Sequence, residues 1–184
     1  VSKNLMAAPW HNIFKDILIA TNENDLEECI PEKLPDMKER QFSKEFVGTF
    51  NGKKLTYTAS LKEKILYEKD NPDIPMASFF YTEYIADSDK NRPVMFSFNG
   101  GPGSASLWLH IGALGPKVVK VPSDASDDGS PPYKMVDNKL SPLSDADLVF
   151  IDPIGTGYSR AIGCHDPKEF WGVNEDPKII AEFI

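Results

Sequence analysis

A short apolar run that breaks into glycines is the feature that most limits how this chain can fold. Residues 93–98 (Pro-Val-Met-Phe-Ser-Phe) are followed directly by Asn99-Gly100-Gly101-Pro102-Gly103. A run of this length that ends at a turn is typical of a strand buried in a sheet with both faces covered. The sequence therefore predicts a buried strand that ends in a glycine-rich loop.

A helix is predicted directly after this loop. Ser104 or Ser106 can cap its start, and Gly115-Pro116 can end it. Its apolar residues recur at helical spacing: Leu107, Trp108, Ile111 and Leu114.

Other segments predict further strands. Residues 46–50 and 55–58 flank Asn51-Gly52, the dipeptide of a type I′ turn, and predict a β-hairpin. Strands are also predicted over 77–85, 117–121 and 147–152, and a last helix over 177–184. Such alternation favours an α/β sheet with helices on its faces. Residues 1–41 are predicted to be an N-terminal extension and linker, and the polar loop at 123–132 is assigned no chemistry.

The charge of the chain excludes some partners. The 184 residues carry a formal net charge of −8, and lysines such as those of Lys62-Glu63-Lys64 alternate with acids, which we interpret as solvated faces. Nucleic acids and anionic membranes need clustered cations, so neither is an expected partner. No apolar run reaches the roughly 20 residues that span a bilayer. The two cysteines, Cys29 and Cys164, have no metal-ligand spacing and could form one disulfide.

The glycine-rich loop has the composition of an oxyanion hole. Glycines allow backbone N–H groups to approach a ligand closely, and a following helix N-terminus favours negative charge. Acyl-transfer enzymes stabilise the tetrahedral intermediate with such fixed donors. A plain Gly-Pro turn is the alternative for a loop of this kind taken alone.

A second glycine-containing segment follows the strand at 147–152. It reads Asp152-Pro153-Ile154-Gly155-Thr156-Gly157-Tyr158-Ser159, and ligands of open α/β sheets bind at such strand ends. It matches no nucleotide motif, since Gly-Lys-Ser/Thr is missing and Arg160 stands where a dinucleotide fingerprint needs a small residue. The alternative is a turn that only packs beside the site.

Taken together, these motifs resemble the serine carboxypeptidase family. The resemblance rests on Asn-Gly-Gly-Pro-Gly after a strand, Leu-Gly-Pro at a helix end, Ala-Asp-Leu-Val-Phe-Ile-Asp, and Gly-Thr-Gly-Tyr-Ser. It is strong over 92–116 and 137–159 and plausible from about Leu55. It implies an α/β-hydrolase-like mixed sheet flanked by helices, of which residues 42–184 form only the N-terminal half.

The resemblance also implies roles for three loop residues. The N–H of Gly101 corresponds to an oxyanion donor, and the Asn99 side chain and the Gly100 N–H correspond to groups that hold the free C-terminal carboxylate of a peptide substrate. It implies no metal and no organic cofactor. Family members usually work outside the cytosol, so we expect a secreted or periplasmic protein.

Three positions depart from the family pattern. Ala113 stands where a Glu often precedes Leu-Gly-Pro and pairs with a second Glu in carboxylate recognition. Ser104 replaces a disulfide cysteine, and Ser97 replaces a tryptophan of the substrate wall. Hydrolase is therefore a firmer prediction than carboxypeptidase.

The largest departure from the family pattern is that these residues contain no motif for the nucleophile. No Gly-x-Ser-x-Gly elbow occurs in these residues, and we expect Ser104, Ser106 and Ser159 to cap or pack. The histidines are interpreted as structural: His11, His110 and His165.

These residues predict a serine-type carboxypeptidase as the full-length protein and an inactive chain when taken alone. An acyltransferase of the same fold and a binding module without a nucleophile are the alternatives. The family sheet order would leave the strand at 93–98 as an open edge, so residues 1–184 alone should not form a stable monomer. The remainder of the hydrolase domain is thus expected to be needed for folding.

Overall fold

The computed structural model describes residues 37–88, 91–100, 103–121 and 132–184. The predicted extension over 1–41 therefore lies almost wholly outside the described residues, as does most of the loop at 123–132. The described elements are β1 (Gln41–Phe50), β2 (Lys53–Tyr67), β3 (Pro75–Ala86), β4 (Val94–Ser97), α2 (Leu107–Leu109), the π-helix η4 (His110–Leu114), β5 (Lys117–Val119), β6 (Met135–Asp137), the 3-10 helix η5 (Pro142–Ser144), β7 (Asp147–Ile151), β8 (Arg160–Ala161), the 3-10 helix η6 (Pro167–Phe170) and α3 (Glu175–Phe183).

The predicted β-hairpin is confirmed. Strands β1 and β2 pair antiparallel from Phe50 opposite Lys53 to Gln41 opposite Lys62. Asn51 has φ 49° and Gly52 has φ 77°, which are the left-handed conformations that a type I′ turn requires.

Strand β2 extends much further than predicted and corrects one interpretation. Glu63 is not on a solvated face: it is 4% exposed. The guanidinium of Arg40 donates to its two oxygens at 2.5 and 2.8 Å, and the hydroxyl of Ser78 also donates to it. A carboxylate can be buried here because all of these donors point at it.

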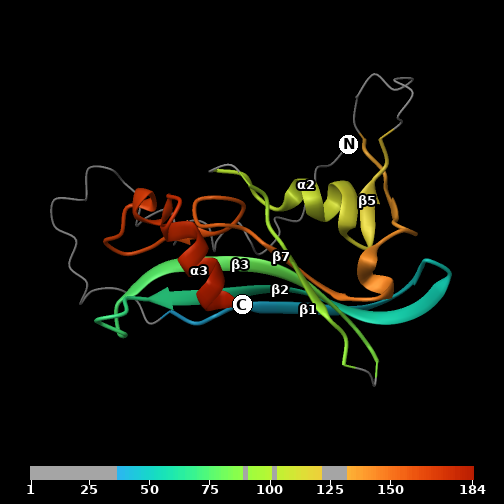
Figure 1. The fold of residues 1–184 in the computed structure, drawn as a ribbon, viewed down its shortest axis with the longest axis horizontal. Coiled ribbons are helices and arrows are strands. Elements are labelled where there is room, and N and C mark those ends of the chain that lie inside the picture. The colour runs from blue at the N-terminus through green and yellow to red at the C-terminus, as the bar shows by residue number, and fades with distance from the viewer. Residues whose placement is uncertain (1–36, 89–90, 101–102, 122–131) are drawn as a thin grey trace, which may run out of the picture.

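Six of the strands within the described residues form one mixed sheet. Its order is β1-β2-β3-β7-β4, and the short β8 pairs with β3. Neighbours are antiparallel except β4 and β7, which run parallel. Figure 1 shows β1, β2 and β3 as one long ribbon, with β7 beside β3. In the described part of the chain, β4 is an edge strand.

The helix after the glycine-rich loop differs from the prediction. It begins as α2 but continues as η4, closed by a bond from the Gly115 N–H to the His110 carbonyl at 2.8 Å. This wider turn shifts the packed face. Leu107 and Trp108 are 49% and 71% exposed, whereas Leu109 and Leu114 contact the core.

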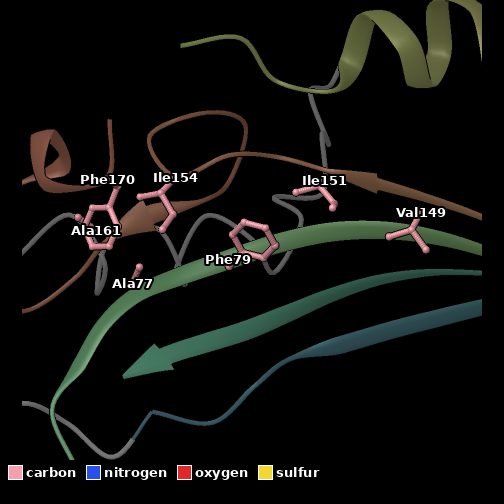
Figure 2. Close-up of a cluster of buried hydrophobic side chains, with 7 residues drawn as sticks. All are labelled: Ala77, Phe79, Val149, Ile151, Ile154, Ala161 and Phe170. Atoms are coloured by element: carbon pink, nitrogen blue, oxygen red, sulfur yellow. The ribbon is translucent and has the colours of Figure 1, made fainter. Parts of the chain in front are cut away.

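Helices cover opposite faces of the sheet. Side chains of a strand alternate between faces, and in β7 Val149 and Ile151 belong to one apolar cluster and Leu148 and Phe150 to the other. Helix α3 packs against the first cluster, which Figure 2 shows between β3 and the segment around Ile154. Segment α2–η4 packs against the second. A mixed sheet between helices is compatible with the predicted α/β class.

Some of the remaining elements were predicted from the sequence and others were not. Strand β5 was expected, and it forms a two-stranded ribbon with β6, which was not. The strand at 147–152 and the last helix are confirmed as β7 and α3. The sequence did not predict η5, η6 or β8, because elements of two to four residues have too few positions to show a periodicity.

Candidate functional site

The glycine-rich loop leaves the carboxyl end of β4, as predicted. The Asn99 amide donates to the Ser104 hydroxyl at 2.9 Å and so closes the loop across its own ends. Gly103 has φ 91°, a backbone conformation that is strained for any residue with a Cβ. Gly101, the predicted oxyanion donor, and Pro102 lie outside the described residues.

Asp152 anchors the far end of the loop. It follows β7, the parallel neighbour of β4, and its Oδ1 accepts both the backbone N–H and the hydroxyl of Ser106 at 2.8 Å each. Ser106 directly precedes α2 and is 4% exposed. Its side chain is therefore not the helix cap that the sequence suggested, because its hydroxyl serves Asp152 instead.

Close contacts with Asp152 and Trp171 explain why glycines occur in the second glycine-containing segment. A Cβ on Gly157 would lie 2.0 Å from Asp152 Oδ2, and Gly157 has φ 51°. A Cβ on Gly155 would lie 2.8 Å from the Trp171 indole nitrogen, which donates to the Ile154 carbonyl at 3.1 Å. Both glycines thus leave room for side chains that shape the strand ends.

Ser159 packs rather than attacks, as predicted. It is fully buried. Its hydroxyl donates to the Asp152 carbonyl at 2.6 Å and accepts the Phe80 N–H at 2.8 Å. It therefore fixes the segment after β7 to β3 and has no access to a substrate.

The loop borders a cavity of about 630 Å³ at the carboxyl ends of β4 and β7. Most of the cavity wall is apolar, and Asp176 is the only ionisable side chain among the described residues that line it. Burial raises the pKa of Asp176 despite a hydrogen bond from the Gly172 backbone. The lining residues are Phe98, Asn99, Gly100, Gly103, Pro153, Ile154, Trp171, Gly172, Val173, Asp176, Pro177, Ile180, Ala181 and Ile184.

Two of the three predicted structural histidines are described. His110 stacks on Phe150 with ring centroids 4.6 Å apart, and its Nε2 lies 2.5 Å from the Tyr84 hydroxyl. Burial lowers the pKa of His110 to about 4 and raises that of Tyr84. His165 is bound by two carboxylates, and His11 lies outside the described residues.

The positions that depart from the family pattern lie in different surroundings. Ala113 is exposed, and its carbonyl accepts the Asn138 amide at 2.7 Å. Ser97 is 8% exposed at the end of β4. Cys164 is disulfide-bonded, whereas Cys29 lies outside the described residues. Ser104 pairs with Asn99, so the hydroxyl supports the loop where the family has a cysteine.

Sequence reasoning missed the contributions of Asp152 and of residues 171–173. The acidic residue at a strand end was visible, but its partner Ser106 is 46 residues away. The cavity wall formed by Trp171 gave no sequence signal, since it follows a 3-10 helix that has no detectable pattern.

Comparison with known proteins identifies the family. A sequence model described as serine carboxypeptidase matches residues 67–169, more than half of the chain. The chain belongs to the serine carboxypeptidase family. The predicted family is thereby confirmed.

The chain is similar to parts of two longer carboxypeptidases. The pheromone-processing carboxypeptidase KEX1 of Saccharomyces cerevisiae (strain JAY291) is 37% identical over 93 residues, which are 50% of this chain and 11% of that protein. Carboxypeptidase Y homolog A of Trichophyton tonsurans is 33% identical over 107 residues, 58% of this chain and 18% of that protein. The aligned part spans less than a fifth of either relative. No solved structure matches the chain significantly.

Two kinds of feature are absent from the described residues. No helix among them has the length and apolar character needed to cross a membrane. No group of three or more His, Cys, Asp or Glu side chains within them is arranged to hold a metal ion.

Proposed function

We propose that the full-length protein is a serine-type carboxypeptidase that hydrolyses C-terminal peptide bonds, and that residues 99–103 supply its oxyanion hole. Family membership supports the reaction class. The observation that carries the site is that Asn99 and Gly100 border the cavity at the carboxyl ends of β4 and β7. Ligands of open α/β sheets bind at such strand ends.

The loop's own residues would hold the substrate at two points. The Gly101 N–H donates to the oxygen that becomes negative in the tetrahedral intermediate, while the Gly100 N–H and the Asn99 amide bind the terminal carboxylate. The amide of Asn99 has two N–H bonds, and Ser104 takes one of them. Nucleophile, base and orienting acid come from the rest of the protein, so this chain alone is inactive.

Hydrogen bonds with neighbouring residues hold the loop in place. Donors stabilise a transition state when they need no reorganisation during the reaction. The Asn99–Ser104 bond and the Asp152–Ser106 bonds fix the loop on both sides. Removing one oxyanion donor costs about 2.7–4 kcal/mol of transition-state stabilisation, or about 10²–10³ in kcat.

Substitution of Gly101 tests the assignment. Gly101→Val in the full-length protein should abolish turnover of N-blocked peptides while the protein stays folded by circular dichroism. Gly112→Ala is the matched control, because Gly112 is exposed and a Cβ there meets nothing within 4 Å. Normal turnover by Gly101→Val would count against the oxyanion role.

A substrate panel separates the proposal from its alternatives. Hydrolysis of peptides with a free C-terminus, together with failure to cleave the corresponding amides, is expected of a carboxypeptidase. Asn99→Ala should reduce that preference. Transfer of the acyl group from an ester to a sugar or amine acceptor would indicate an acyltransferase, and binding without turnover would indicate a binding module.

The proposed location is outside the cytosol, in a secreted or periplasmic form. The disulfide bond at Cys164 supports it, because disulfides persist mainly in oxidising compartments. Peptide and protein C-termini are the proposed partners.

A further inference from the structure

His165 joins two segments that are distant in sequence. Its Nε2 lies 3.0 Å from Glu68 Oε1, just after β2, and its Nδ1 lies 2.8 Å from Glu169 Oε2, in η6. The His165 side chain is only 14% exposed. We call these three residues the His165 clamp.

The clamp requires a doubly protonated ring. Ionised carboxylates only accept hydrogen bonds, and neutral imidazole has a single N–H, so both bonds exist only with the imidazolium form. The other carboxylate oxygens are already bound: Asn71 donates to Glu68 Oε2 at 3.1 Å, and the Asp166 N–H donates to Glu169 Oε1 at 3.0 Å. The hydrogen bond from His165 is the main cause that lowers the pKa of Glu169.

Other charged side chains line the same cavity as Glu68 and Glu169: Lys64, Lys69, Asp70, Glu175, Lys178 and Glu182. Lys69 and Asp70 follow Glu68, and Asp166 and Lys168 precede Glu169; all four are exposed. Among the described residues, the ion pairs of His165 are those with Glu68 and Glu169. The Phe170 ring lies edge-on to it at 6.3 Å. Deprotonation of the ring therefore removes the cation that faces both carboxylates.

The clamp is connected to the candidate site through a very short segment. Phe170 follows Glu169 and is 1% exposed. It belongs to the apolar cluster drawn in Figure 2. Trp171 comes next, donates to the Ile154 carbonyl at 3.1 Å and lines the cavity together with Gly172 and Val173. Glu169 is two residues from Trp171 in the cavity wall, so a shift of Glu169 is passed to that wall.

We propose that His165 is a positioning residue: its imidazolium holds η6 against the β2–β3 connection, and loss of a proton loosens the cavity wall formed by residues 171–173. The effect on substrate rests on the proposed function. Both clamp bonds need ionised carboxylates and a ring that carries two N–H groups, and the lowered pKa of Glu169 favours its ionised form. Loss of either ring proton removes one of the two bonds.

Hydrogen exchange of the full-length protein tests the clamp without reference to activity. After correction for intrinsic rates, protection of amides in residues 165–173 should fall about tenfold between about pH 5.5 and pH 8. In His165→Gln protection should be low at both values, and in Glu68→Gln it should be intermediate. Lys168→Gln, which removes a neighbouring charge, should behave like the wild type. A pH-independent wild type, or unchanged pH dependence in both clamp variants, would overturn the proposal.

Kinetics on blocked peptides test the coupling to the site. KM of the wild type should rise about fivefold over the same pH range, more than that of His165→Gln, with little change in kcat. Exchange that follows the prediction while KM shows the same pH dependence in both proteins would refute the coupling. Absence of any peptide hydrolysis would refute the proposed function, and the exchange result would still decide the clamp.

Discussion

Removing the Asp152 carboxylate should destabilise the protein through the loop end that it holds. In Asp152→Ala the N–H and hydroxyl of Ser106, both at 2.8 Å from Oδ1, lose their acceptor. Ser106 is 4% exposed, and a buried group left without a partner costs about 1–3 kcal/mol. Because Asp152 itself is only partly buried, water can replace some of the loss. We therefore expect a decrease of about 2 kcal/mol in the free energy of unfolding.

Urea denaturation of the full-length protein measures this change. Asp152→Asn retains Oδ1 as a neutral acceptor, so its loss should be about 1 kcal/mol. In a double-mutant cycle, Asp152→Ala and Ser106→Ala should show a coupling above about 0.5 kcal/mol, since they remove the same contact. Gly157→Ala should be destabilising as well, because its Cβ would displace Asp152 Oδ2.

The same variant should also affect turnover. If the Asp152–Ser106 contact fixes the loop that carries Gly101, kcat should fall in Asp152→Ala under conditions where the protein is fully folded. Additive losses in the double-mutant cycle, or an unfolding free energy equal to that of the wild type, would refute the reasoning.

Two further predictions concern the core and the sheet edge. Burial lowers the pKa of His110 to about 4 from an ordinary 6.5, so the unfolded state binds the proton more readily and stability should fall as pH drops from about 6.5 to 4, by up to roughly 3 kcal/mol. His110→Phe should flatten this dependence in urea titrations at several pH values, and an unchanged slope would contradict it. Residues 1–184 expressed alone should aggregate, because β4 is an apolar edge strand in the described sheet; a monomer that melts cooperatively, seen by ultracentrifugation and calorimetry, would show this wrong.

Local patterns determined the strands and the order of the motifs. The type I′ turn at Asn51-Gly52, the strand that became β7 and the strand-to-glycine transition at β4 all depend on neighbouring residues, so each was predictable. The family followed from the same motifs. The apolar face predicted for α2–η4 was only partly right: Leu114 packs against the core, whereas Leu107 and Trp108 are exposed. A π-turn arises from packing and has no sequence signature.

Contacts between distant segments were decided only by the tertiary structure. The sequence placed the glycine-rich loop at a strand end, and Gly100 and Gly103 border the cavity there. It could not show that Asp152 holds Ser106, that Arg40 neutralises Glu63 or that His165 joins Glu68 to Glu169. The sequence separations are 46 residues for Asp152 and Ser106, 23 for Arg40 and Glu63, and 97 for His165 and Glu68. Hydrogen bonds of this kind depend on strand order and register, and the residues between the partners do not encode them.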